Sequence, residues 1–128
     1  MDEGKLIHQA LTEQILGAAI EVHRFWGPGL YEEIYERSLC AELTLCKIAF
    51  EKQLPLPLLY KGIAVGADLR LDLWVDRKVV VEIKSVTELL PVHEAQLLTY
   101  LRLTKSPVGL LINFNVAVLK NGIKRLVH

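Results

Sequence analysis

The stretch VVVEIKSV, residues 79–86, places two charged side chains inside an otherwise apolar run. Side chains alternate between the two faces of an extended strand, so Glu82 and Lys84 share a face with Val80 while the residues between them point the other way. A charge on so apolar a strand is costly unless it is paired or used. We therefore expect a buried strand whose two charges have partners or a function.

The amount of apolar sequence favours one compact domain over residues 1–128. The chain is 52% hydrophobic, which supplies a sizeable core and argues against disorder. Fifteen basic residues balance fifteen acidic residues, so the formal net charge is zero. This balance argues against a strong, diffuse attraction to nucleic acid or to an anionic membrane, but it leaves room for a local basic patch.

Three features favour a cytoplasmic protein without membrane contact. The N-terminal residues lack the basic start and apolar stretch of a secretory signal. No apolar run approaches the roughly 20 residues needed to cross a bilayer. Cys40 and Cys46 fall on different faces of a predicted helix, so we expect two reduced, packed thiols rather than a disulfide.

The order of the predicted elements indicates an α/β domain with a mixed sheet. Helical spacing of apolar residues predicts helices over residues 11–26, 30–46 and 91–104, the first of them capped by Thr12. Apolar and alternating runs predict strands over residues 48–54, 68–75, 79–86 and 107–114, and the prolines around residues 56–60 place that segment at a sheet edge. Asn121-Gly122 predicts a hairpin turn between strands over residues 116–120 and 123–127.

The connection between the strands over residues 68–75 and 79–86 decides whether an acidic cluster forms. Alternation places the leucines and Val75 on one face of the first strand, and Asp68, Arg70, Asp72 and Trp74 on the other. If residues 76–78 form a three-residue loop, Val75 faces Val79 and Asp72 falls opposite Glu82. A two-residue loop would shift the register by one and turn Asp72 to the wrong face. The cluster is thus a conditional prediction.

Two adjacent carboxylates followed by an ammonium group suit metal-assisted phosphate chemistry. The carboxylates of Asp72 and Glu82 repel each other, which favours a divalent cation between them, and hard oxygen ligands suit Mg²⁺ or Mn²⁺. Lys84 could contact a phosphate oxygen or orient an attacking water. A surface ion pair between Glu82 and Lys84 is the alternative, and the pattern Asp-x9-Glu-x-Lys alone is too short to decide.

Two further motifs accompany this pattern. GLYEEIY places Gly29, Glu32 and Tyr35 in a Gly-x-x-Glu-x-x-Tyr arrangement at the start of the second predicted helix. HEAQLLTYL places Gln96 and Tyr100 four residues apart, one helical turn after His93.

Together these motifs resemble the GxxExxY proteins, a branch of the PD-(D/E)XK nuclease-like superfamily. The resemblance runs from about Leu11 to Phe114 and is carried by GPGLYEEIYE, YKG, RLDLWVDRKVVVEIKSV, HEAQLLTYL and the NF at 113–114. It implies a restriction-endonuclease-like core, in which a central mixed β-sheet is flanked by helices. Leu71 stands where the name of the superfamily records proline.

The resemblance also implies roles for individual residues. Asp72 and Glu82 match the metal-binding acids, Lys84 matches the catalytic lysine, and Glu32 matches an acid that assists the metal from a helix. Gln96 and Tyr100 match the Gln-x3-Tyr motif of exonuclease-type relatives, which supports the active site and contacts DNA. We expect these two residues and Tyr35 to bind substrate.

Several of these residues also have a structural interpretation, which stays open at this point. An acid such as Glu32 is favourable in the first turn of any helix. Tyr35 suits a packed aromatic with a hydrogen-bonded hydroxyl, and Gln96 and Tyr100 suit satisfied buried groups. The remaining candidates are His93 as an acid, a base or an ordinary helical residue, Trp26 as a packed ring, and Trp74 as a packed ring or a base-stacking one.

The chain is thus expected to be a Mg²⁺- or Mn²⁺-dependent phosphodiesterase (a nuclease) that acts on DNA or, less readily, on RNA. The alternative is a non-catalytic nucleic-acid-binding or protein-interaction module on the same fold, which the zero net charge favours. A chain of this length has little surface for reading nucleic-acid sequence. An active enzyme is therefore expected to be structure-specific, homodimeric or directed by a protein partner.

Overall fold

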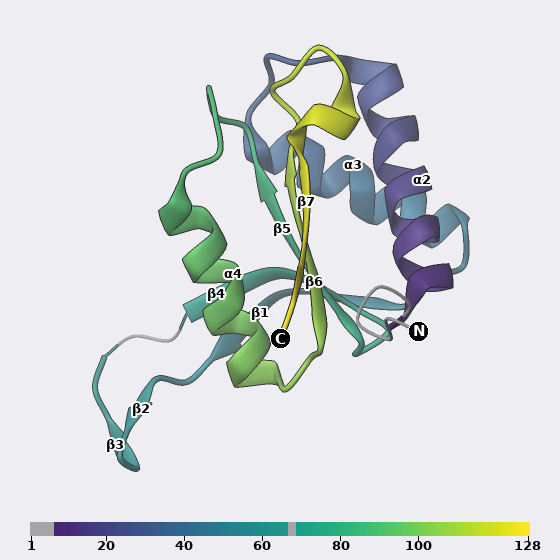
Figure 1. Cartoon of the computed structure of the whole chain (residues 1–128). Helices are drawn as coiled ribbons and strands as arrows, with labels where there is room; N and C mark the ends of the chain where they lie inside the picture. The colour runs from purple at the N-terminus through teal and green to yellow at the C-terminus, as the bar shows by residue number, and fades with distance from the viewer. Residues whose placement is uncertain (1–6, 67–68) are drawn as a thin grey trace.

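A five-stranded mixed sheet forms the centre of the computed structural model, which describes residues 7–66 and 69–128 (Figure 1). Its strand order is β1-β4-β5-β6-β7, and only β5 and β6 run parallel. The strands are β1 (Phe50–Leu56), β4 (Leu69–Val75), β5 (Val79–Lys84), β6 (Val108–Asn113) and β7 (Ile123–Val127). Asp68, expected at the start of a strand, lies outside the described residues.

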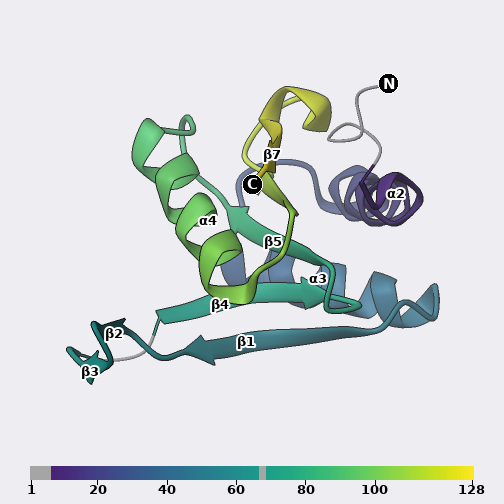
Figure 2. The same ribbon diagram turned by 60° about the horizontal axis from the view of Figure 1, so that its bottom comes forward.

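Three helices cover the two faces of this sheet, as Figures 1 and 2 show. Helices α2 (Gln9–Trp26) and α3 (Glu32–Leu45) pack on one face, and α4 (Pro91–Thr104) packs on the other. Strand β5 serves both layers: Val79, Val81 and Ile83 join the α2–α3 side, and Val80 joins the α4 side. The α/β class, the mixed sheet and the flanking helices are all confirmed.

The register of the β4–β5 hairpin is the one that brings the acidic residues together. Val75 pairs with Val79 and Leu73 with Val81, as the three-residue loop requires. Asp76 and Arg77 both take left-handed φ angles, 51° and 52°, and the Lys78 N–H donates to the Val75 carbonyl over 2.9 Å. This tight turn leaves Asp72 and Glu82 next in register.

Strand β4 does not keep the simple alternation that its sequence indicates. Leu73 and Val75 pack on the α2–α3 side, whereas Leu71 packs on the α4 side. The change of side occurs at Asp72, opposite Gln53 of β1, which has a left-handed φ of 49°. Strands β1 and β4 thus each turn over near the middle, at Gln53 and Asp72, and the sheet opens locally around Asp72.

The C-terminal hairpin expected at Asn121-Gly122 is wrong. Leu119–Gly122 forms a short 3₁₀ helix, η1, and β7 pairs with β6 instead of with residues 116–120. The glycine serves close packing rather than a turn: a Cβ at Gly122 would lie 2.2 Å from the Asn113 carbonyl oxygen. The expected Thr12 cap is also wrong, because α2 already begins at Gln9 and the Thr12 hydroxyl donates to the Gln9 carbonyl.

Gly122→Ala is expected to destabilise the protein by about 1–3 kcal/mol, because the added methyl group meets backbone that cannot swing away. Gly17→Ala is the matched control, since Gly17 lies exposed in α2 with open space around its Cβ position. That variant should gain roughly 0.5–1 kcal/mol from helix propensity. Urea unfolding measures the change in the free energy of unfolding for both variants. Equal changes in the two variants would contradict the packing role of Gly122.

The rest of the fold comprises a short separate ribbon and two unpaired cysteines. Strands β2 (Leu59–Tyr60) and β3 (Ile63–Ala64) form a separate two-stranded ribbon, with Lys61 and Gly62 at its turn. Both cysteines are free, as expected; Cys40 is buried, but Cys46 is exposed rather than packed. No helix in the described part of the chain has the length and apolarity to span a membrane.

Candidate active site

Asp72 and Glu82 lie side by side where β4 and β5 part. The Asp72 N–H donates to Glu82 Oε1 over 3.0 Å, and the Ile83 N–H donates to Asp72 Oδ2 over 2.8 Å. The last main-chain pair between β4 and β5 is Leu73 with Val81. Beyond that pair, the two side-chain hydrogen bonds replace main-chain hydrogen bonds between the strands. These bonds fix both carboxyl groups against backbone and leave oxygens of each for a further ligand.

Burial and mutual repulsion keep this carboxyl pair from carrying two charges easily. The Glu82 side chain is almost entirely buried, and burial together with the charge of Asp72 raises its pKa to about 8. Burial also raises the pKa of Asp72, against the Ile83 N–H and the charge of Lys84, which lower it. A cation between the two groups would relieve the same repulsion, so the pair fits a divalent ion.

Helix α3 approaches the pair with Glu36 rather than with Glu32. Gln53 Nε2 donates to Glu36 Oε1 over 2.8 Å and, more weakly, to Asp72 Oδ1 over 3.4 Å. Burial and the nearby Asp72 raise the pKa of Glu36. Glu32 is exposed. Together with Glu36 and Gln53, it lines a cavity of about 560 Å³ between α3, β1 and Asp72. Its charge reaches Asp72, whose pKa it raises.

Sequence reasoning missed two members of this cluster. Glu36 had a signal, because it lies one helical turn after Glu32 on the same stripe of α3. Gln53 had none, because its place at the site depends on a left-handed backbone conformation that glutamine rarely adopts.

A hydrogen-bonded chain joins Lys84 to α4 and back to β4. Lys84 Nζ donates to Gln96 Oε1 over 3.5 Å, and Gln96 Nε2 donates to the Tyr100 hydroxyl over 3.2 Å. The Tyr100 hydroxyl donates in turn to the Arg70 carbonyl over 3.2 Å. Burial and the charges of Glu82 and Asp72 raise the pKa of Tyr100 to about 12. The hydroxyl therefore keeps its proton and remains the donor to the Arg70 carbonyl.

Three other candidates have structural partners. Tyr35 is fully buried, stacks on Phe114 and donates its hydroxyl to the Gly27 carbonyl, contacts that favour a packing role. His93 caps α4 by accepting the Leu90 N–H at Nδ1. The Trp74 indole donates to Ser106 and carries the Arg77 guanidinium over its ring, so it packs.

The carboxylates do not form a ready-made cage for an ion. Within residues 7–66 and 69–128, no three His, Cys, Asp or Glu side chains are grouped closely enough to hold a metal. Proteins usually bind Mg²⁺ through only one or two carboxylates. The ion completes its coordination shell with several waters or with phosphate oxygens. The arrangement therefore suits an ion that is completed by water and by a phosphorylated substrate.

Comparison with known families gives this geometry its context. A sequence model described as PD-(D/E)XK nuclease superfamily matches residues 9–126, which include every residue of the cluster. Comparisons with curated proteins and with solved structures gave no match. The match covers nearly the whole chain, and the chain therefore belongs to the PD-(D/E)XK nuclease superfamily.

Proposed function

We propose that the protein is a Mg²⁺- or Mn²⁺-dependent phosphodiesterase of the GxxExxY type, which cleaves nucleic acid and favours DNA over RNA. The observation that carries this proposal is the pair Asp72 and Glu82 at the opening of the sheet, with Lys84 one pleat further along β5. Membership of a nuclease superfamily supports a nucleic-acid substrate.

Four residues of the site have a part in this proposal. Asp72 and Glu82 hold the ion, and Glu32 assists from the exposed rim of the cavity. A bound divalent ion supplies Lewis acidity toward a phosphate oxygen and lowers the pKa of a coordinated water. Lys84 stabilises the negative charge that develops on the phosphate.

Helix α4 supports this arrangement from the face of β5 that carries Glu82 and Lys84. Gln96 holds the Lys84 ammonium group, and Tyr100 fixes the Gln96 amide through its own bond to the β4 backbone. The half-buried Gln96 retains some surface for contact with a substrate, whereas Tyr100 has almost none. A substrate contact is thus proposed for Gln96, and Tyr100 acts through it.

Addition of Mn²⁺ or Mg²⁺ should raise the melting temperature of the wild-type protein. At a metal concentration 100 times the Kd, the gain is roughly 2.7 kcal/mol, or a shift of several degrees for a domain of this size. Glu82→Ala should abolish the shift, and Glu13→Ala, at an exposed acid of α2, should keep it. Wild-type protein without any shift at millimolar metal would contradict the ion site.

A substrate panel then separates the enzyme from a non-catalytic module, the candidate that the balanced net charge favours. Single-stranded, duplex and branched DNA and RNA are incubated with wild-type protein and Mn²⁺. Cleavage that requires both metal and Glu82 supports the phosphodiesterase. Metal binding and nucleic-acid binding without cleavage of any substrate would instead identify a binding module.

A further inference from the structure

A groove runs along the outer seam between α2 and α3. It consists of two cavities, of about 260 Å³ and 400 Å³, which share Glu21 and Glu42 as lining residues. The first cavity extends toward Trp26 at the end of α2, and the second extends toward Gln14. Gln14 and Trp26 are twelve residues apart on one helix, so the groove is roughly 18 Å long. This is the length of a three-turn helix.

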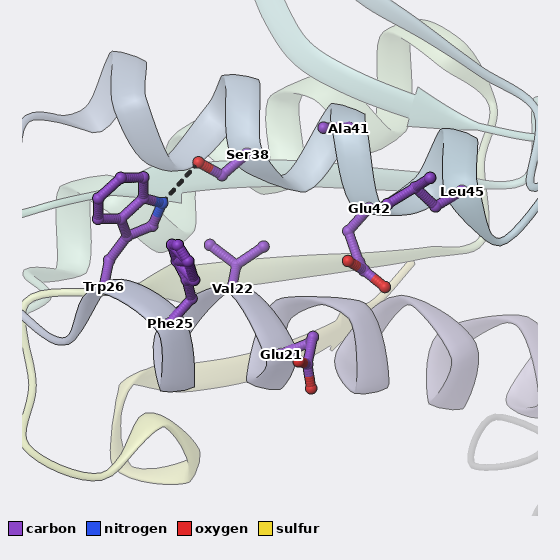
Figure 3. Close-up of a pocket in the computed structure, with 8 residues that line it drawn as sticks. All are labelled: Glu21, Val22, Phe25, Trp26, Ser38, Ala41, Glu42 and Leu45. Carbon is purple, nitrogen blue, oxygen red and sulfur yellow. Dashed lines mark hydrogen bonds between the residues drawn. The ribbon is translucent and has the colours of Figure 1, made fainter.

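One end of the groove is apolar and exposed, as Figure 3 shows. Phe25 is 71% exposed and Trp26 47%, whereas Leu45, 77% exposed, lies at the opposite end of this cavity, beyond Glu42. The Phe25 and Trp26 rings meet edge to face at 4.7 Å, and Trp26 Nε1 donates to Ser38 Oγ over 2.9 Å. These contacts hold the aromatic pair in place, so a ligand would not have to order it. Rigid aromatic residues of this kind are typical anchors of protein interfaces.

The middle of the groove is acidic. Glu21 from α2 and Glu42 from α3 line opposite sides of the cavity; the Glu42 carboxylate points toward α2, and the Glu21 carboxylate lies over α2 in this view (Figure 3). Arg24 lies 3.9 Å from Glu21, and because both side chains are largely exposed this ion pair contributes little. Glu42 accepts only a weak bond from the Cys46 thiol, at 3.6 Å. The two carboxylates therefore retain negative charge for a cationic ligand.

We propose that this groove binds an amphipathic segment of a partner protein, which places an apolar anchor at Phe25 and Trp26 and a Lys or Arg beside Glu21 and Glu42. Phe25 follows Glu21 by one helical turn, roughly 6 Å along the axis. The anchor and the basic residue of the ligand are thus four positions apart in a helix or two in a strand. The acidic banks repel phosphates, so a protein ligand fits this groove and a nucleic acid does not.

This surface lies on the outer side of α2 and α3, whereas the candidate active site lies between α3, the sheet and α4. The inference does not depend on the chemistry of that site, so each can fail without the other. A docking groove would supply the partner-directed targeting that a chain with little surface of its own requires.

Selection from a phage-displayed library of random 16-residue peptides tests the proposal. The full chain serves as bait, and the double variant Glu21→Lys/Glu42→Lys serves for counter-selection. We expect enriched peptides with a Lys or Arg two or four positions from a large apolar residue. No enrichment, or a consensus without a basic residue, would overturn the proposal.

The enriched peptide is then synthesised and titrated against the protein while Trp26 fluorescence is followed in a Trp74→Phe background. We expect a blue shift on binding, a loss of affinity of at least about tenfold in Glu21→Lys/Glu42→Lys, and recovery when the basic residue of the peptide becomes Glu. Equal affinity of wild type and double variant overturns the groove as the site. Sedimentation from 10 to 200 μM is the last check: a dimer dissociated by Phe25→Asp makes a second copy the occupant and overturns the assignment to a different protein.

Discussion

Lys84→Met should lower the rate of metal-dependent cleavage by about 10²–10³-fold, the usual cost of removing one group that stabilises transition-state charge. Methionine keeps the length and the apolar stem of the side chain, so the packing of β5 should survive while the ammonium group is lost. The variant should still show a metal-induced rise in melting temperature, because Asp72 and Glu82 remain. Single-turnover cleavage at saturating metal measures the effect.

The pH of that comparison matters, because Lys84 acts on the carboxyl pair as well as on a substrate. Its charge lowers the pKa of both Asp72 and Glu82, so its removal makes the pair harder to ionise. Rates are therefore compared at about pH 9, above the pKa of about 8 for Glu82, as well as at pH 7.5. Lys120→Met, at an exposed position of η1, is the control and should cleave like wild type. If Lys84→Met cleaves every substrate at the wild-type rate, the enzyme proposal fails.

The parts of this site that could be predicted are those set by local pattern. Alternation along β5 placed Glu82 and Lys84 on one face, and the length of the turn placed Asp72 opposite Glu82. Helix α4 was predicted with its observed bounds, because Pro91 starts it and its apolar residues keep helical spacing. Spacing along the helix then brought Gln96 and Tyr100 together.

The parts that could not be predicted depend on how elements meet in three dimensions. The left-handed conformation of Gln53 turns β1 over, and this turn brings an amide to Glu36 and Asp72. Nothing in the local sequence requires that conformation. Gly122 had a turn signal, yet the structure uses it for close approach to the Asn113 carbonyl, a contact between segments that only the tertiary fold defines.

Glu82→Gln should stabilise the metal-free protein at alkaline pH, although the same change removes a metal ligand. The pKa of Glu82 is raised from 4.5 to about 8, so the folded protein prefers the protonated carboxyl group. The stability that this group contributes is fully present below pH 4.5 and is lost as pH rises through about 8. Glutamine does not titrate. Its oxygen can still accept the Asp72 N–H, and its amide nitrogen can donate to the Asp72 carboxylate.

Urea unfolding at pH 5.5 and pH 8.5, with EDTA present, measures this effect. Wild type should lose stability between the two pH values, and Glu82→Gln should lose less, so that the variant is more stable by roughly 1–3 kcal/mol at pH 8.5. Glu88→Gln, at an exposed acid, should stay within about 0.5 kcal/mol of wild type. Excess Mn²⁺ should reverse the order at pH 8.5, because only wild type gains the free energy of metal binding. If the free energy of unfolding of wild type and of Glu82→Gln changed in parallel with pH, Glu82 would ionise without cost. The buried, mutually repelling carboxyl pair would then not exist in solution.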